Sequence, residues 1–158
     1  MSSFLVIQKA FIINPKWQTL IMKRGESDIH WDLPGGRLEH GQSLKQSLTE
    51  IVLHETNLRL TTVSIPLNLT SYLDPADRNH QIVRVTYLCV GEGKAESPHH
   101  QDTLEWITIS DYQKYQFPDE SYAQTFENYL SHSKLASIEF LGSGMLEDSI
   151  SYLKQSTS

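Results

Sequence analysis

A glycine-rich loop that runs into a helix is the part of this sequence best suited to chemistry. The loop reads Leu33-Pro34-Gly35-Gly36-Arg37-Leu38-Glu39-His40-Gly41-Gln42-Ser43. Glycines let a backbone approach a ligand closely, and the first N–H groups of a helix have no partner within the helix. Such free N–H groups point at whatever binds in front of them. The segment therefore predicts a ligand site at the loop.

The helix after the loop carries a carboxylate among its apolar side chains. The apolar residues recur at the spacing of an amphipathic helix, at Leu44, Leu48, Ile51 and Val52. At about 100° per residue, Glu55 falls inside this apolar stripe, whereas Glu50 lies about 140° away from Glu55 around the helix. A carboxylate in an apolar stripe costs free energy unless it is paired or coordinates a metal. Two interpretations stay open: Glu55 turns out to solvent at the last turn, or it is held against the loop and binds a divalent cation.

Runs of β-branched and aromatic residues on both sides of this segment predict the strands that position it. We expect these strands at 4–13, 19–22, 58–65, 68–73, 82–90 and 104–109. Turn signals separate them at Asn14-Pro15, Asp74-Pro75 and Gly91-Glu92-Gly93. The pattern indicates a mixed α/β domain.

Three helices complete the expected fold. In the central one, Ser43 is the N-cap and Gln46 completes a capping box. That helix runs to about Thr56, and Asn57 ends it in the left-handed conformation. Apolar residues at helical spacing predict two further helices, at 121–130 and 145–153.

Length and charge limit the classes of protein that this chain can belong to. With 158 residues, a single compact domain is expected. The chain has 13 basic and 19 acidic residues, so its formal charge is −6. That balance argues against a protein that coats a nucleic-acid polymer, because such binding depends on neutralising phosphates. A small anionic ligand remains compatible with it.

Cysteine usage and hydropathy point to a soluble protein. Cys89 is the one cysteine, so no internal disulfide can form, and its apolar surroundings predict a buried side chain. The first residues lack the basic head of a signal peptide. No apolar stretch approaches the roughly 20 residues that span a bilayer. We therefore expect a cytoplasmic protein without a membrane partner.

The loop and helix resemble the Nudix box, G-x5-E-x7-R-E-U-x-E-E-x-G-U, of the MutT-like Nudix hydrolases. Neighbouring segments agree with that family, namely the apolar first strand, a strand ending in Lys23-Arg24, Trp31 ahead of Pro34, and Leu104-Glu105-Trp106-Ile107 followed by Ser110-Asp111-Tyr112. The resemblance covers about residues 3–131. It implies an α/β/α sandwich with a mixed β-sheet and one domain over 1–158, of which about 132–158 form a C-terminal extension.

The box of this chain departs from the family pattern. Four of its nine specified positions match, at Gly36, Val52, Glu55 and Leu58. The other five are replaced, by Gln42, Glu50, Ile51, His54 and Asn57. In the family, the helix glutamates bind magnesium and help water to attack a pyrophosphate. Because two of the three glutamates at the end of the helix are missing, the resemblance implies an altered metal site.

The resemblance still assigns ligands for a Mg²⁺ or Mn²⁺ ion. Glu55 is the main one, a backbone carbonyl of Gly35 or Gly36 can add an oxygen, and Glu39 can support the site unless it is a solvated loop residue. His54 offers a nitrogen, which suits manganese or zinc better than magnesium.

The resemblance suggests a catalytic base, and the chemistry of arginine suggests substrate ligands. Some members take a base from the loop near Leu104, where Asp102 and Glu105 are the candidates. Arg24, Arg37 and Arg84 could hold a diphosphate, because arginine pairs bidentately with phosphate oxygens. For Arg84 a surface salt bridge is the alternative.

Two functions therefore follow. The first is a hydrolase that cleaves a pyrophosphate bond in a nucleoside diphosphate linked to another group, with Glu55 in the catalytic site. The second is an inactive Nudix-fold module that binds a nucleotide or a protein. A requirement for a divalent metal would separate them. The expected partner is a nucleotide-like small molecule, and a homodimer is an option because many members of the family pair.

Overall fold

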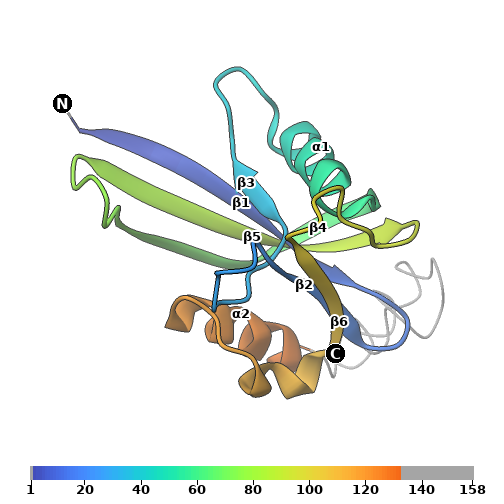
Figure 1. The fold of residues 1–158 in the computed structure, drawn as a ribbon. Coiled ribbons are helices and arrows are strands. Elements are labelled where there is room, and N and C mark those ends of the chain that lie inside the picture. Colours follow the sequence, from blue (N-terminus) through green and yellow to red (C-terminus); the bar gives the residue numbers. More distant parts are fainter. Residues whose placement is uncertain (1, 133–158) are drawn as a thin grey trace, which may run out of the picture.

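A mixed β-sheet with a helix on each face forms the body of the protein (Figure 1). The computed structural model describes residues 2–132, which contain a six-stranded sheet in the order β4-β5-β1-β2-β6, with β3 paired to β1. The strands are β1 (Ser3–Ile13), β2 (Gln18–Lys23), β3 (Gly35–Arg37), β4 (Arg59–Leu73), β5 (His80–Glu92) and β6 (Thr103–Thr108). The predicted α/β/α sandwich is confirmed.

Strand β1 lies at the centre of the sheet and has two partners on one of its edges. It pairs in parallel with β5 along its whole length. On its other edge it pairs antiparallel with β3 at Ile7–Lys9 and with β2 at Ile13. Figure 1 shows β2 and β3 diverging from this point. The sheet therefore splits beside β1, and side chains from both faces can meet there.

Helix α1 (Leu44–Thr56) covers one face of the sheet. Its buried residues Leu48 and Val52 pack with Ala10, Ile12 and Cys89. The burial of Cys89 confirms the sequence prediction. At the start of the helix, the Ser43 side chain accepts the Gln46 N–H, as expected for an N-cap. The Gln46 amide nitrogen donates to Glu50 at 3.2 Å, and the reciprocal half of the predicted capping box stays a prediction.

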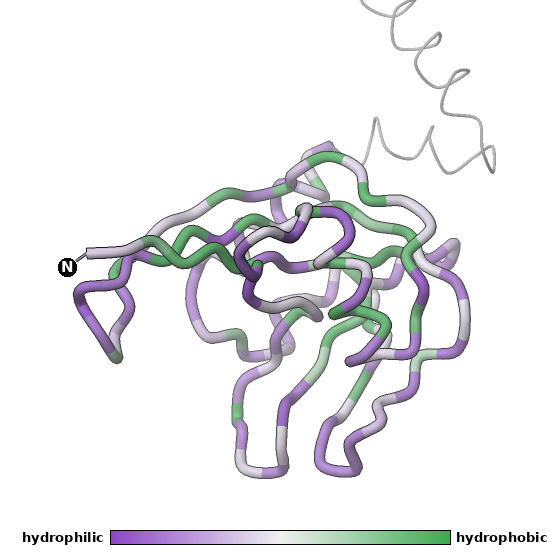
Figure 2. The backbone as a smooth tube through the Cα atoms, turned by 90° about the horizontal axis from the view of Figure 1, so that it is seen from above, coloured by the Kyte–Doolittle hydropathy of each residue, from purple (hydrophilic) through white to green (hydrophobic). Residues whose placement is uncertain are grey.

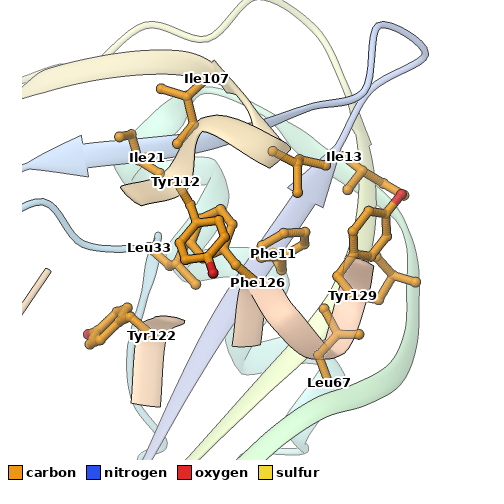
Figure 3. Packing of buried hydrophobic residues seen from close by; sticks show 12 residues of the cluster. Phe11, Ile13, Ile21, Leu33, Leu67, Ile107, Tyr112, Tyr122, Phe126 and Tyr129 are labelled. Carbon is orange, nitrogen blue, oxygen red and sulfur yellow. The ribbon is translucent and has the colours of Figure 1, made fainter. Parts of the chain in front are cut away.

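The opposite face of the sheet is covered by helix α2 (Glu120–Ser131) and a short 3-10 helix, η1 (Ile109–Lys114). Phe11 of β1 meets Phe126 and Tyr129 of α2 with ring centroids 5.1 and 5.2 Å apart. Tyr112 of η1 stacks on Phe126 (Figure 3). This aromatic packing fixes α2, and with it Tyr122, over the sheet. Figure 2 shows hydrophobic residues along the central strands and hydrophilic ones in the projecting loops.

Three expectations about the elements are corrected. Residues 35–37, expected as loop, form β3. Segments 58–65 and 68–73, expected as two strands, form the single bulged strand β4. Pro66 does not end β4, because β4 is an edge strand that can lose a ladder N–H. The strand expected to reach residue 109 ends at Thr108, where η1 begins. The remaining predicted helix, 145–153, lies outside the described residues.

Asn57 ends α1 as predicted, with φ of 64°. Within residues 2–132, none of the helices combines the length and hydropathy that crossing a membrane requires.

Gly35 is the residue that lets β3 approach β1. Its φ is +146°, and a Cβ added there would lie 2.0 Å from the backbone oxygen of Gln8. Only glycine fits at that distance. The Gly35-Gly36 segment can therefore form a strand next to β1, although two glycines are typical of a loop.

We expect Gly35→Ala to lower the free energy of unfolding by about 3 kcal/mol or more, because the clash is with backbone. Gly25→Ala is the matched control. Gly25 also has a positive φ, +78°, but a Cβ there would meet nothing within 4 Å. Its cost should be about 1–2 kcal/mol, the ordinary penalty of the left-handed conformation. Urea unfolding of both variants measures the difference, and equal losses would contradict the close approach of β3.

Candidate active site

Two cations and two carboxylates alternate where the sheet splits. They are Lys9, Asp32, Arg24 and Glu55, and together they form the ion cluster. Lys9 Nζ of β1 donates to Asp32 Oδ2 at 2.9 Å, and Arg24 Nη1 donates to the same oxygen. The other side of the Arg24 guanidinium faces Glu55 of α1, with Nε at 3.0 Å and Nη2 at 2.8 Å from Oε2. The formal charges of the four groups cancel. Arg24 is the member that joins the two carboxylates.

Glu55 is held against β3, which contains Gly35 and Gly36 and is called the glycine strand below. Its Oε1 accepts the Gly35 N–H at 2.8 Å, and Arg24 Nη2 also donates to the Gly35 carbonyl oxygen at 3.2 Å. The Glu55 side chain is 17% exposed. The interpretation that Glu55 turns out to solvent is therefore wrong. Its position against the loop agrees with the other interpretation, whose metal-binding part stays a prediction.

Asp32 connects the cluster to helix α2. A backbone bridge between Asp32 and Met22 places Asp32 beside the end of β2, close to Arg24. Asp32 Oδ1 accepts the Tyr122 hydroxyl at 2.6 Å and the Leu33 N–H at 2.7 Å. Through Asp32 and Arg24, α2 on one face of the sheet is thus linked to α1 on the other.

The cluster members shift one another's pKa values. Burial by itself would raise the pKa of Asp32, but the charges of Lys9 and Arg24 hold it below its ordinary value of 3.8. Burial lowers the pKa of Lys9, which the attraction of Asp32 only partly offsets. For Arg24, burial is outweighed by Asp32 and Glu55, so its pKa is raised. Burial and the charge of Asp32 raise the pKa of Tyr122, which keeps its hydroxyl a donor.

A cleft of about 810 Å³ opens onto the cluster between the sheet and the start of α2. Lys9, Asp32 and Tyr122 belong to both the cleft wall and the cluster. Farther along, the buried Arg84 guanidinium lies over Tyr122, 4.4 Å from its ring centroid, and donates to Asp119 at 3.1 Å. The cleft therefore has aromatic and charged walls and ends at the ion cluster.

The two candidate bases lie in different places. Asp102 Oδ1 accepts the N–H of Gly25, the residue after Arg24, at 3.0 Å. Glu105 lies in β6 on the face that α2 covers, two residues before the buried Ile107. Its Oε1 accepts the Tyr115 hydroxyl at 3.3 Å. Asp102 is therefore the one that borders the segment carrying Arg24.

The remaining predicted ligands surround the glycine strand without meeting at Glu55. Gly36 lies beside Ile51, since a Cβ on Gly36 would be 3.5 Å from that side chain. Arg37 and Glu39 are exposed and line a shallow recess next to β1. His54 is exposed, with its ring 5.9 Å from that of His99.

Sequence reasoning missed Lys9, Asp32 and Tyr122. A usable signal existed for Lys9, a charged residue inside the apolar run of residues 4–13. For Asp32 and Tyr122 no local signal existed, because 90 residues separate these two partners.

The donor set can be compared with the needs of a divalent cation. Among residues 2–132, no group of three or more His, Cys, Asp and Glu side chains could hold a metal ion. Magnesium is commonly bound by one or two carboxylates together with substrate phosphates and waters. Glu55 and a carbonyl oxygen of the glycine pair fit such a cation when it comes with the substrate's phosphates. Without those phosphates, one carboxylate and one carbonyl oxygen can hold a cation only weakly.

Comparisons with known proteins identify the family. A sequence profile of the NUDIX domain matches residues 6–127. A Bacillus subtilis (strain 168) protein provisionally assigned as an 8-oxo-dGTP diphosphatase is 27% identical over 103 residues, which cover 64% of this chain and 66% of that protein, just under two thirds of its length.

Solved structures share the fold. The E. coli ORF135 protein has a TM-score of 0.70 at 16% identity, covering 84% of this chain and 92% of that one. The MutT protein of Methanosarcina mazei Go1 has a TM-score of 0.70 at 17% identity, covering 84% and 97%. At these identities the likeness concerns the fold alone.

We expect Asp32→Asn to lower the free energy of unfolding at pH 7 by about 1–3 kcal/mol, because Lys9 and Arg24 lose a charged partner. Since the folded-state pKa of Asp32 is lowered, its contribution is present above the ordinary pKa and is lost as the pH falls through the folded-state pKa.

The difference between wild type and Asp32→Asn should therefore shrink below about pH 4. Urea unfolding across the acid range measures it. Asp111→Asn is the control, because Asp111 forms an exposed pair with Lys114. A difference that stays constant down to pH 2 would contradict the role given to the Asp32 charge.

Proposed function

Because the chain belongs to the Nudix family, we propose that it hydrolyses a pyrophosphate bond in a nucleoside diphosphate linked to another group. The observation that carries the proposal is Glu55, the one matching glutamate of the helix, held against Gly35 by its bonds to the Gly35 N–H and to Arg24. Arg24 is in turn bonded to Asp32, which lines the cleft. The cleft volume is within the range of about 300–1,000 Å³ usual for small-molecule sites.

The phosphates of the substrate would bind at the glycine strand. Arg24 faces this strand from one side, and Arg37 belongs to it. Arginine presents paired N–H donors to phosphate oxygens, so Arg24 and Arg37 are the proposed phosphate ligands. The cleft would take the nucleoside, with Arg84 and Tyr122 as its charged and aromatic wall.

An Mg²⁺ or Mn²⁺ ion bound with the substrate would neutralise charge on the phosphate oxygens. Glu55 and a carbonyl oxygen of Gly35 or Gly36 are its proposed protein ligands. This is an altered site, because Ile51 offers no ligand and packs beside Gly36. Glu39 and His54 would have to move to take part.

Asp102 is the preferred base of the two candidates, and Glu105 is the alternative. Asp102 borders Arg24 through its bond to Gly25, whereas Glu105 is engaged with Tyr115 on the face covered by α2. A carboxylate in this position would accept the proton of the attacking water. The arrangement of Arg24 and Arg37 would hold the phosphate for that attack.

The second candidate function is a nucleotide-binding module without catalysis. The replacement of two family glutamates by Ile51 and His54 favours it, as does the engagement of both Glu55 oxygens by donors of the protein. Such a module would bind its ligand in the presence of a chelator, whereas the hydrolase requires a divalent cation.

Turnover of a nucleotide panel tests the proposal. 8-Oxo-dGTP, named for the Bacillus relative, comes first, followed by nucleotide sugars and dinucleoside polyphosphates, each with Mg²⁺ and with Mn²⁺. We expect phosphate or pyrophosphate release that falls about 10²-fold or more in Glu55→Gln, since a metal ligand is removed. Release that is unchanged in Glu55→Gln would refute the role of this residue, and no release with either metal would favour the binding module.

A gain-of-function variant tests whether the helix alone limits the rate. Ile51→Glu with His54→Glu restores the two missing glutamates at the end of the helix, so the kcat of the double variant should rise above that of wild type. Glu50→Gln is the control, because Glu50 is exposed on another side of α1. A double variant that folds but gains no activity would place the deficit outside the helix.

A further inference from the structure

Both oxygens of Glu55 are already engaged by donors of the protein. Two N–H groups of Arg24 converge on Oε2, at 3.0 and 2.8 Å, while Oε1 accepts the Gly35 N–H. A carboxylate oxygen ligates a metal through its lone pairs. With these donors in place, Glu55 has few lone pairs left to offer a cation.

Charge adds to this obstruction. With Arg24 in place the four-residue cluster is neutral, and the Glu55 side chain is mostly shielded from water. A divalent cation added at Glu55 would face the positive charge of Arg24 at short range, where screening is weak. A diphosphate brings negative charge that offsets both cations. Cation and diphosphate are therefore expected to bind better together than either binds alone.

The Arg24 guanidinium has a second anchor that does not depend on Glu55. Its Nη1 is bonded to Asp32, on the side away from Glu55. Asp32 is itself fixed by Lys9, Tyr122 and the Leu33 N–H. Arg24 can therefore stay attached through Nη1 while Nε and Nη2 exchange Glu55 for phosphate oxygens. Its side chain is 34% exposed, so a ligand can reach it.

We propose that Arg24 acts as an exchange residue that keeps a divalent cation from Glu55 until a diphosphate takes over its guanidinium. This inference rests on the proposed function, which supplies both the diphosphate ligand and the divalent cation. Arg24 positions Glu55 in the free protein and releases it in the complex. By linkage, the diphosphate raises the affinity for the cation by the same factor as the cation raises the affinity for the diphosphate.

The test is binding of Mn²⁺ alone, read from the electron paramagnetic resonance signal of the free ion. The four proteins are wild type, Arg24→Gln, the double variant Arg24→Gln with Glu55→Gln, and Arg59→Gln. Arg59 is the matched control, because it is an arginine in an exposed pair with Glu92, on an edge strand that lies two strands from β1 in the sheet.

Arg24→Gln should bind Mn²⁺ about tenfold more tightly than wild type or more, a factor within the usual range of coupling between sites. Arg59→Gln should match wild type, and the double variant should lose the gain. A single variant without the gain, or a gain that survives the loss of Glu55, would overturn the proposal. If Arg24→Gln does not fold, Arg24→Lys keeps one positive charge for Asp32 but lacks the forked group, and a smaller gain is expected.

A second arm adds millimolar inorganic phosphate, with a protein-free titration at the same concentration as reference. Phosphate should raise the Mn²⁺ affinity of wild type and Arg59→Gln but not that of Arg24→Gln, and an equal rise in all three would overturn the exchange. Both arms measure Mn²⁺ binding and not turnover, so their outcomes can be distinguished from those of the hydrolysis test. A Glu55-dependent gain in a protein without hydrolase activity would uphold the exchange and refute only the hydrolase.

Discussion

The requirement that a carboxylate removed from water must be paired governs the centre of this molecule. Two such carboxylates, Asp32 and Glu55, come from different parts of the chain and meet at the split beside β1. Arg24 pairs with both carboxylates through one planar guanidinium. A lysine could not do this, because its charge is a single point. The bond from Tyr122 to Asp32 brings α2 into the same arrangement. The cluster thus fastens the two helical layers to each other across the gap in the sheet.

The position of Glu55 depends in turn on backbone geometry. Gly35 places β3 so close to β1 that no side chain fits between them, and its N–H and carbonyl groups then face Glu55 and Arg24. Gly35 therefore has two roles, in strand pairing and in holding the carboxylate. The same bonds satisfy Glu55 in the free protein, which explains how a helix that has lost two of the family's glutamates still keeps the third in place.

Local patterns in the sequence predicted the local features of the structure. Helical spacing and the caps Ser43 and Asn57 gave the bounds of α1 and singled out Glu55. Strand β3 was missed because a glycine pair is typical of a loop, and its pairing depends on a close approach that no propensity expresses. The partners of Glu55 and Asp32 were missed because they are distant in the chain: 31 residues separate Arg24 from Glu55, and 90 separate Asp32 from Tyr122. The Nudix resemblance supplied the layers of the fold, but it could not show that Arg24 occupies the remaining glutamate.

The central claim is that the Arg24–Glu55 pair links the helix to the glycine strand, and a double-mutant cycle on stability tests it most directly. Urea unfolding of wild type, Arg24→Gln, Glu55→Gln and the double variant gives the coupling free energy. The account predicts a coupling of about 1 kcal/mol or more, because each single variant deprives a partly buried charge of a charged partner. Additive effects, within about 0.5 kcal/mol, would contradict it.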